Sequence, residues 1–296
     1  MEQYIEQFLI YLKQEKQYSD NTINSYEKDF KKFLQFLKEE KINNLDEIDF
    51  KLLRKYLFYL HEKNYTNKTT ARMISSLKSF YKYLIKKKIT NKNPMSLIKT
   101  PKIEKKLPKF LYYDELEQIL AIPDKTTTLG LRDALLLEML YSTGIRVSEI
   151  VSVKLKDIDF YDKRILILGK GNKERYVLYG NKMQKLLEQY MEESRPKLLP
   201  KDDYLLLNRY GEQLTDRGVR KIIDSILKKG IVNQHISPHT LRHTFATHML
   251  DSGADIKIVQ ELLGHESLST TQIYTHVSNE KIRTVYQKNH PRAKMK

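Results

Sequence analysis

The segment "KNPMSLIKTPKIEKKLPKFL" (92–111) interrupts helical patterning that continues on both sides of it. It contains three prolines and no regular apolar repeat, so neither a helix nor a strand can run through it. A chain of 296 residues is also longer than most single cores grow, which favours two domains. The sequence therefore predicts an N-terminal domain over 1–97, a linker over 98–108 and a second domain over 109–296.

Before this segment, four stretches place apolar residues three and four positions apart, the period of an amphipathic helix. Ser19 and Asp20 precede the second stretch and are suitable N-caps. The first domain is therefore expected to be a small four-helix bundle. The stretches are "YIEQFLIYLKQE" (4–15), "TINSYEKDFKKFLQFLKEE" (22–40), "FKLLRKYLFYLHEK" (50–63) and "TTARMISSLKSFYKYLIKK" (69–87).

After the segment, helical patterns enclose two β-rich runs, "RILILG" (164–169) and "ERYVLYG" (174–180). They are separated by "KGNK" (170–173), the composition of a tight hairpin turn. "DYLLLN" (203–208) is a candidate third strand. The fold class predicted is mainly α, with a mostly helical second domain around a small antiparallel sheet. Later helices are expected over 215–229, 238–251 and 255–264, the last ending at Gly264.

The charge is distributed unevenly, although the whole chain carries a net +16. Residues 1–50 hold 7 basic and 11 acidic side chains, whereas residues 51–100 hold 13 basic and one acidic side chain. A lysine-rich codon bias would not change sign within a domain, so the basic block favours a nucleic-acid partner over a solvated lysine face. Arg72 and Lys78 lie in this block and are candidate DNA contacts.

The composition also excludes several classes of protein. The absence of cysteine rules out disulfides, thiolate nucleophiles and cysteine-ligated zinc. The sequence shows neither an apolar run long enough to cross a bilayer nor a signal peptide. We therefore expect a soluble, cytoplasmic protein without a membrane partner.

The segment "SPHTLRHTFATHML" (237–250) concentrates histidine and arginine at the start of a predicted helix. His239 and His243 have the spacing of zinc ligands, but "HTLRH" lacks a glutamate base, and Arg242 would place a positive charge beside the metal. A helix N-terminus and an arginine fork together favour an anion such as phosphate. Zinc and a buried structural histidine remain open as alternatives.

Two further segments carry basic residues next to a glycine turn. In "YSTGIRVSEI" (141–150), Arg146 opens a helix with Glu149 three positions later, which by itself is as typical of a surface ion pair. In "GKGNKER" (169–175), Lys170 and Lys173 flank the hairpin turn. Lysines in turns are usually solvated, but one at a hairpin tip could enter a DNA groove and donate a proton to a leaving oxygen.

The segment "LLGHESLSTTQIYTH" (262–276) adds His265 just after a helix end and Tyr274 nine residues later. A single tyrosine is more often a packing residue than a nucleophile. Beside two arginines and a histidine, however, a phenol has what is needed to attack a phosphodiester without a metal ion.

Arg146, Lys170, His239, Arg242, His265 and Tyr274 occur in the order seen in the tyrosine recombinases, which this chain resembles. The four segments quoted above are similar to those of the Xer branch, and the resemblance extends through most of 1–296, including "NHPRA" (289–293). It implies a SAM-like core-binding domain that binds DNA, followed by a catalytic domain.

The resemblance also implies a role for each residue. Tyr274 attacks the scissile phosphate and forms a 3′-phosphotyrosyl bond, while Arg146 and Arg242 bind the nonbridging oxygens. Lys170 protonates the leaving 5′-oxygen, His239 takes part in proton transfer with the tyrosine, and His265 hydrogen-bonds the phosphate. Glu149 supports Arg146. No cofactor, metal ion or ATP is expected.

The partners that the resemblance implies are a double-stranded recombination site and a tetramer on DNA, built from one chain or shared with a paralogous recombinase. Strand exchange through a Holliday junction would resolve chromosome or plasmid dimers at cell division, with a septal DNA translocase as a further partner. Lys173, Arg217 and Arg220 are additional candidate DNA contacts, together with Lys221. For Arg217, Arg220 and Lys221, the alternative is a solvated face of the helix after Thr215.

Two other functions fit part of the pattern. A type IB topoisomerase would apply the same chemistry to one duplex, and a non-catalytic DNA-binding protein would use the segments only structurally. In the tail, Ile282, Val285 and Tyr286 form a short apolar stripe. The resemblance implies that this stripe packs on a neighbouring protomer, and a frayed basic tail is the alternative.

Overall fold

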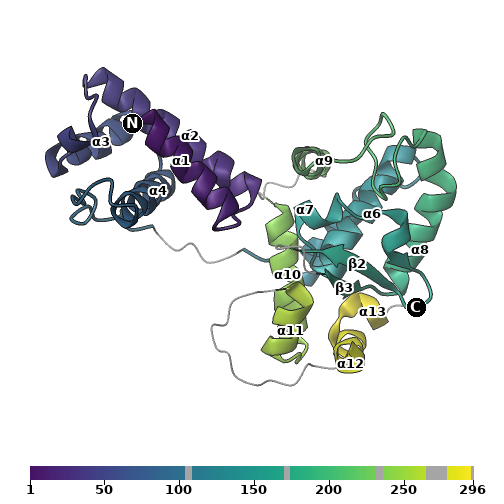
Figure 1. Cartoon of the computed structure of the whole chain (residues 1–296). Coiled ribbons are helices and arrows are strands. Elements are labelled where there is room, and N and C mark those ends of the chain that lie inside the picture. Colours follow the sequence, from purple (N-terminus) through teal and green to yellow (C-terminus); the bar gives the residue numbers. More distant parts are fainter. Residues whose placement is uncertain (104–108, 170–173, 231–235, 265–278, 295–296) are drawn as a thin grey trace. The chain divides into compact units, whose positions relative to one another are not determined.

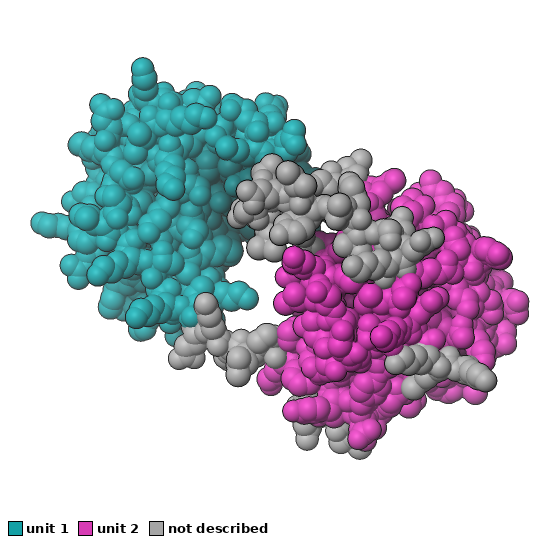
Figure 2. Space-filling model, turned by 90° about the horizontal axis from the view of Figure 1, so that it is seen from below, with its two compact units in different colours: residues 1–106 teal, residues 107–296 magenta. Residues whose placement is uncertain are grey.

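The computed structural model describes residues 1–103, 109–169, 174–230, 236–264 and 279–294 (Figure 1). The chain divides into two compact units, Met1–Lys106 and Leu107–Lys296, which Figure 2 colours separately. Each unit has its own hydrophobic core. Within the described residues, no helix is both long and apolar enough to cross a lipid bilayer.

The first unit is the helical bundle that the patterning predicts. Its helices are α1 (Glu2–Gln14), α2 (Asp20–Glu39), α3 (Phe50–Glu62) and α4 (Asn67–Lys86), with a 3₁₀ turn at Leu45–Glu47. Ser19 caps α2 as expected, because its hydroxyl accepts a hydrogen bond from the Thr22 amide. Aromatic rings fill the core: the Phe8 ring lies 5.8 Å from that of Phe30 and 5.4 Å from that of Phe80.

The second unit is built around helix α6 (Thr128–Thr143), which is buried at almost every position from Leu131 to Thr143. A helix that is buried at nearly every position has to lie inside a domain, and the described residues of this unit form eight further α-helices. These are α5 (Tyr113–Ala121), α7 (Val147–Ile150), α8 (Asn181–Gln189), α9 (Asp216–Lys229), α10 (Pro238–Asp251), α11 (Ile256–Leu263), α12 (Asn279–Asn289) and α13 (Pro291–Lys294). Short turns of 3₁₀ or π helix lie at Leu155–Asp157, Tyr190–Ser194 and Arg195–Leu198.

Among the described residues, the sheet has three antiparallel strands in the order β1 (Ile158–Asp159), β2 (Arg164–Leu168) and β3 (Glu174–Leu178). The strands β2 and β3 pair from Arg164 opposite Leu178 to Leu168 opposite Glu174, so the antiparallel pairing of the two β-rich runs is confirmed, and the predicted turn between them lies outside the described residues. With the helical bundle, this confirms the predicted fold class.

The third strand, however, is not the predicted "DYLLLN" segment (203–208). There, Tyr204 and Leu207 form only isolated bridges. Side chains take up the carbonyl groups instead, because the Tyr190 hydroxyl donates to Leu205 and the Arg195 guanidinium donates to Tyr204. Its apolar run reflects burial on all sides rather than a place in a sheet.

The C-terminal helices pack against the second unit of the same chain. Tyr286 is 2% exposed and donates from its hydroxyl to the Ser142 carbonyl at 3.0 Å, while Ile282 and Val285 pack on the same core. In the single chain, the stripe in the tail therefore packs on its own unit. Its packing on a neighbouring protomer of a tetramer stays a prediction. The frayed-tail alternative is wrong for these residues.

Arg292, in α13, is fully buried and joins the tail to two carboxylates of the second unit. Its Nη2 lies 2.7 Å from Glu117 Oε1 and its Nε lies 3.4 Å from Glu138 Oε1. The backbone amide of Arg292 also donates to His290 Nδ1. Burial, with the Arg292 charge nearby, lowers the pKa of His290 to about 3.

Candidate active site

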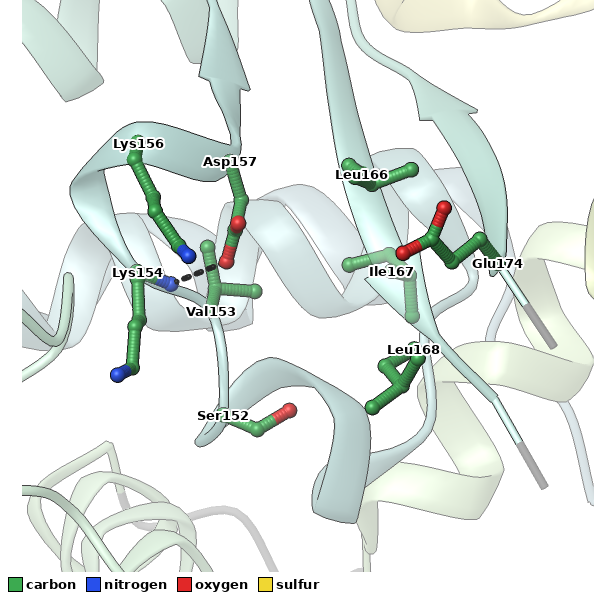
Figure 3. A pocket seen from close by; sticks show the side chains of 9 residues that line it. All are labelled: Ser152, Val153, Lys154, Lys156, Asp157, Leu166, Ile167, Leu168 and Glu174. Carbon is green, nitrogen blue, oxygen red and sulfur yellow. Dashed lines mark hydrogen bonds between the residues drawn. The ribbon is translucent and has the colours of Figure 1, made fainter. Parts of the chain in front are cut away.

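Among the described residues, the lining of the cavity beside the sheet includes none of the predicted catalytic residues. The cavity has a volume of about 260 Å³ and lies between the Lys154–Asp157 turn and the strands β2 and β3 (Figure 3). Lys154 and Lys156 face it together with Asp157 and Glu174, so its charges are balanced. The described residues therefore give this cavity no excess of positive charge with which to bind a phosphate group.

The predicted arginines lie elsewhere, and Arg146 owes its place to the end of α6. Gly144 ends that helix in the left-handed conformation (φ 59°), where an added Cβ would lie 2.6 Å from a ring carbon of Phe245. The chain turns sharply there, and Arg146 becomes the N-cap of α7 with one third of its side chain exposed. Its guanidinium is therefore fixed at the surface of the core.

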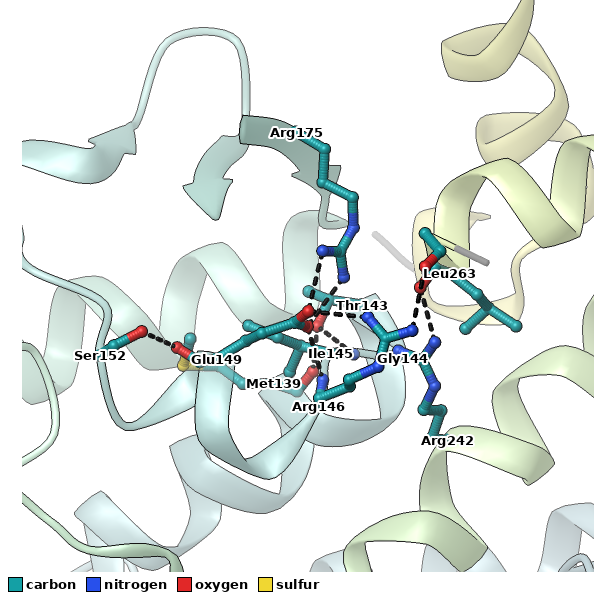
Figure 4. Close-up of polar contacts among 11 residues, drawn as sticks. Met139, Thr143, Gly144, Ile145, Arg146, Glu149, Ser152, Arg175, Arg242 and Leu263 are labelled. Carbon is teal, nitrogen blue, oxygen red and sulfur yellow. Dashed lines mark hydrogen bonds and ion pairs between the residues drawn. The ribbon is translucent and has the colours of Figure 1, made fainter. Parts of the chain in front are cut away.

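Arg242 comes from the second turn of α10, a helix that begins as the sequence predicts. The Ser237 hydroxyl accepts a hydrogen bond from the Thr240 amide, and Pro238 occupies the first helical position. Arg242 is 8% exposed, and its guanidinium donates to the carbonyl of Gly144 at 2.5 Å and to that of Leu263 at 2.6 Å (Figure 4).

The end of α11 brings the two arginines together. Gly264 ends that helix in the left-handed conformation (φ 64°), as the sequence predicts. Its carbonyl accepts a hydrogen bond from Arg146 Nη2 at 2.9 Å, one residue after the Leu263 carbonyl that holds Arg242. The backbone at 144 and 263–264 thus positions both guanidinium groups.

This arrangement places two positive charges close together. Burial, followed by the charge of Arg146, lowers the pKa of Arg242 to about 10. A bound anion would relieve the repulsion between the two guanidinium groups. The geometry therefore fits a phosphate group, and it would repel a divalent cation.

Glu149 is the counter-ion within this cluster, and it has two arginine partners rather than one. It is 4% exposed, and its carboxylate accepts hydrogen bonds from Arg146 and from both terminal nitrogens of Arg175 (Figure 4). Burial would raise the pKa of Glu149, but the hydrogen bonds from Arg175 and Arg146 outweigh it and hold the pKa at about 2.

Arg175 is a residue of this cluster that the sequence analysis does not single out. A signal was available, because side chains two positions apart on a strand share a face, and Val177 is an obvious core residue. Arg175 therefore faces inward with Val177, which is 1% exposed.

His239 lies in the first turn of α10 and is exposed. It lines a cavity of about 280 Å³ with Arg220 and Asp224. Within the described parts of the chain, no group of three or more histidine, aspartate or glutamate side chains could hold a metal ion, so His239 and His243 have no third ligand there. The buried histidine of this helix is His248, which bonds the Tyr141 hydroxyl and the Leu111 carbonyl, each at 3.0 Å.

Comparison with known proteins agrees with this geometry. The model of the phage integrase family matches residues 109–281, and that of the phage integrase N-terminal SAM-like domain matches residues 5–88. The tyrosine recombinase XerC of Anoxybacillus flavithermus is 46% identical over 290 residues, which are 97% of each chain. The chain belongs to the phage integrase family of tyrosine recombinases.

Two further similarities extend over most of this tyrosine recombinase. XerC of Oceanobacillus iheyensis is 45% identical and covers 99% of this chain and 97% of its own. A crystal structure of the XerH site-specific recombinase, in a post-cleavage complex with palindromic difH substrate, is 28% identical with a TM-score of 0.70. The match covers 90% of this chain and 79% of XerH. The prediction of a site-specific tyrosine recombinase is thus confirmed.

The remaining predicted residues of this recombinase fall into three groups, of which the first lies outside the described residues and the others lie on α9 and α4. Lys170, Lys173, His265 and Tyr274 lie outside the described residues. On α9, Arg217, Arg220 and Lys221 are all exposed.

The candidate DNA contacts of the first unit lie on α4. Arg72 lines an open groove of about 460 Å³, and its Nη1 lies 2.5 Å from both carboxylate oxygens of buried Asp29. Lys78 donates to the Thr100 hydroxyl at 3.5 Å. The Arg72 head is therefore anchored within the bundle, although 46% of its side chain remains exposed.

Proposed function

We propose that this chain cuts and rejoins double-stranded DNA with Tyr274 as nucleophile and Arg146 and Arg242 as the phosphate clamp. The observation that supports this most directly is the pair of guanidinium groups held by the carbonyls of Gly144, Leu263 and Gly264. Because backbone groups fix both arginines in advance, they need little reorganisation when negative charge develops on the phosphate.

The other residues complete an acid and base set. Lys170 donates a proton to the leaving 5′-oxygen, and His239 assists proton transfer at the Tyr274 hydroxyl. His265 hydrogen-bonds the phosphate. The exposed position of His239 in the first turn of α10 supports its role, since DNA can reach it there.

The chemistry conserves the energy of the phosphodiester bond. Attack by the Tyr274 oxygen forms a 3′-phosphotyrosyl ester and breaks the bond to the 5′-oxygen, which leaves as a hydroxyl. The 5′-hydroxyl of a partner duplex then attacks this ester and releases the tyrosine, which produces a Holliday junction after one pair of exchanges. Neither ATP nor a cofactor takes part.

DNA binding and assembly belong to the same proposal. The core-binding domain (1–97) and the catalytic domain (109–296), joined by the linker (98–108), bind one half-site through contacts that include Arg72, Lys78, Lys173, Arg217 and Arg220. Four protomers, identical or shared with a paralogous recombinase, act on two sites. Resolution of chromosome or plasmid dimers in the cytoplasm, with a septal DNA translocase, is the biological role that we infer.

Trapping of the covalent adduct tests the proposal. A half-site with a nick near the scissile phosphate should accumulate protein joined to the 3′ end, whereas Tyr274→Phe should bind the same DNA and form no adduct. Adduct formation by Tyr274→Phe would contradict the assignment of the nucleophile. Joining of two different duplexes would distinguish a recombinase from a topoisomerase that reseals one.

Chelation tests the metal-free mechanism. Adduct formation should continue in EDTA, because Arg146 and Arg242 neutralise the phosphate charge that a metal pair would otherwise neutralise. Loss of the adduct in EDTA and recovery with zinc would restore the metal interpretation of "HTLRH".

A further inference from the structure

We propose that Arg175 is a positioning residue for DNA cleavage: it shares the Glu149 carboxylate with Arg146, so that the positive charge of Arg146 stays available to the scissile phosphate and its guanidinium stays in place. This inference rests on the proposed function, because it requires Arg146 to bind that phosphate.

Arg146 and Arg175 share the Glu149 carboxylate. Its Oε1 accepts from Arg146 Nη1 at 2.8 Å and from Arg175 Nη1 at 2.9 Å. Its Oε2 accepts from the Arg146 amide at 2.9 Å and from Arg175 Nη2 at 2.8 Å. Each arginine therefore contacts both oxygens, and the two arginines compete for one negative charge.

The cluster formed by these two arginines, Arg242 and Glu149 carries a net positive charge. Arg146, Arg242 and Arg175 carry three positive charges against the single negative charge of Glu149. Without Arg175, the buried carboxylate would pair with Arg146 alone and weaken its attraction for a phosphate group. With Arg175 present, Glu149 still orients Arg146, but a net charge of about two remains for an anion.

Arg175 also lies against Gly264, the other anchor of Arg146. A Cβ added to Gly264 would lie 2.9 Å from Arg175 Nε and 3.0 Å from its Cζ. The Arg175 side chain therefore lies against the residue whose carbonyl holds Arg146 Nη2. One side chain supports Arg146 both through Glu149 and through the end of α11.

Exposure separates the roles of the two arginines. The Arg146 side chain is 33% exposed and that of Arg175 is 17% exposed, so Arg146 is the more accessible to DNA.

Arg175 pairs with Ile167 in the β2–β3 ladder, one position from the last pair before the turn. An alternative role is therefore to hold the hairpin that carries Lys170, and the experiment has to distinguish the two.

The test is single-turnover cleavage of a nicked half-site at saturating DNA. We expect Arg175→Gln to bind the half-site normally and to cleave about 10²-fold more slowly, the order of loss that a misplaced catalytic group produces. Arg164→Gln is the matched control, since Arg164 lies on β2 and pairs with Asp159 and Asp162. It removes the same charge from the same sheet and should cleave normally. Equal rates for Arg175→Gln and the wild type would overturn the proposal.

A second substrate, with sulfur in place of the 5′-bridging oxygen, separates the proposed role from an effect on Lys170. Sulfur leaves without a proton, so it should not restore cleavage by Arg175→Gln. Restoration would mean that Arg175 acts through the hairpin and would overturn the proposal. Failure of the wild type to form the Tyr274 adduct would instead contradict the proposed function.

A double-mutant cycle tests the dependence on Glu149. Arg175→Gln should cost less in the Glu149→Gln background, where no buried carboxylate competes for Arg146. An equal cost in both backgrounds would overturn the proposal.

Arg175→Lys keeps the charge but not the two-oxygen contact, and its rate should lie between those of Arg175→Gln and the wild type. If Arg175→Gln fails to bind the half-site, cleavage by Arg175→Lys at the wild-type rate would overturn the proposal.

Discussion

The guanidinium of Arg242 donates to the carbonyl of Gly144, which lies 98 positions earlier in the chain, at 2.5 Å. Two elements distant in sequence thus form one candidate anion site: the glycine that ends α6 and the arginine in α10. The Gly144 carbonyl is available because the left-handed turn directs it away from a continuing helix.

Gly144→Ala should therefore impair both stability and cleavage. The new methyl group would lie 2.6 Å from Phe245 and 2.8 Å from Leu263, at a φ of 59°. We expect a loss of about 1–3 kcal/mol in the free energy of unfolding, together with slower cleavage because Arg242 loses its anchor. Gly253→Ala is the control, since Gly253 also has a positive φ but no atom within 4 Å of the added Cβ. Urea unfolding and single-turnover cleavage should distinguish the two variants. Identical behaviour would contradict the role of the Gly144 carbonyl in holding Arg242.

Lys170→Ala should abolish cleavage of ordinary DNA and recover with the 5′-sulfur substrate, because a thiolate leaves without a general acid. Lys173→Ala, on the same predicted turn, is the matched control and should show no selective recovery. The rates on both substrates are measured at saturating DNA. Selective recovery of Lys173→Ala instead would transfer the role to Lys173.

Glu149 should make the protein less stable in acid. Its folded pKa of about 2 lies below the ordinary value of 4.5, so its contribution is complete above pH 4.5 and declines as the pH falls toward 2. Between pH 5 and pH 3, we expect the wild type to lose about 2 kcal/mol more than Glu149→Gln in the free energy of unfolding. Urea titrations of both proteins at pH 5 and pH 3 measure the free energy of unfolding. An equal loss in the wild type and in Glu149→Gln would show that Glu149 does not titrate between these pH values.

Tyr286→Ala should destabilise the free protein in the absence of DNA. The ring is buried within its own unit and its hydroxyl bonds the Ser142 carbonyl, so removal of the side chain should cost about 3 kcal/mol or more. Lys288→Ala, at an exposed position of the same helix, should have little effect. Thermal unfolding of the monomer measures both variants. Unchanged stability of Tyr286→Ala would show that the helix packs elsewhere in solution.

Much of the fold could be predicted from local patterns. Helices α1 to α4 and α9 to α11 follow the spacing of their apolar residues, and the caps at Ser19, Ser237 and Gly264 depend on neighbouring residues alone. The "DYLLLN" segment was misassigned because a short apolar run does not reveal whether its backbone pairs with a strand or with side chains.

Local patterns could not predict the tertiary contacts. The buried Arg292 in the tail is stabilised by Glu117 and Glu138, partners more than 150 positions away that only the folded chain brings near. Its positive charge suggested a solvated tail, since a lone arginine almost never enters a core without such partners.

The sequence by itself determined the order of the candidate catalytic residues and the local elements that carry Arg146, His239 and Arg242, because turns, caps and periodicity depend on residues close together in the chain. Only the tertiary structure decided which groups surround Arg146 and Arg242. Glu149 appeared in the sequence as the partner of Arg146 alone, and Arg175 as one more charge beside a turn. Folding places Arg146 and Arg175 on the buried carboxylate of Glu149. An unpaired charge at this buried position would cost a large free energy of desolvation, and that cost determines the geometry of the three side chains.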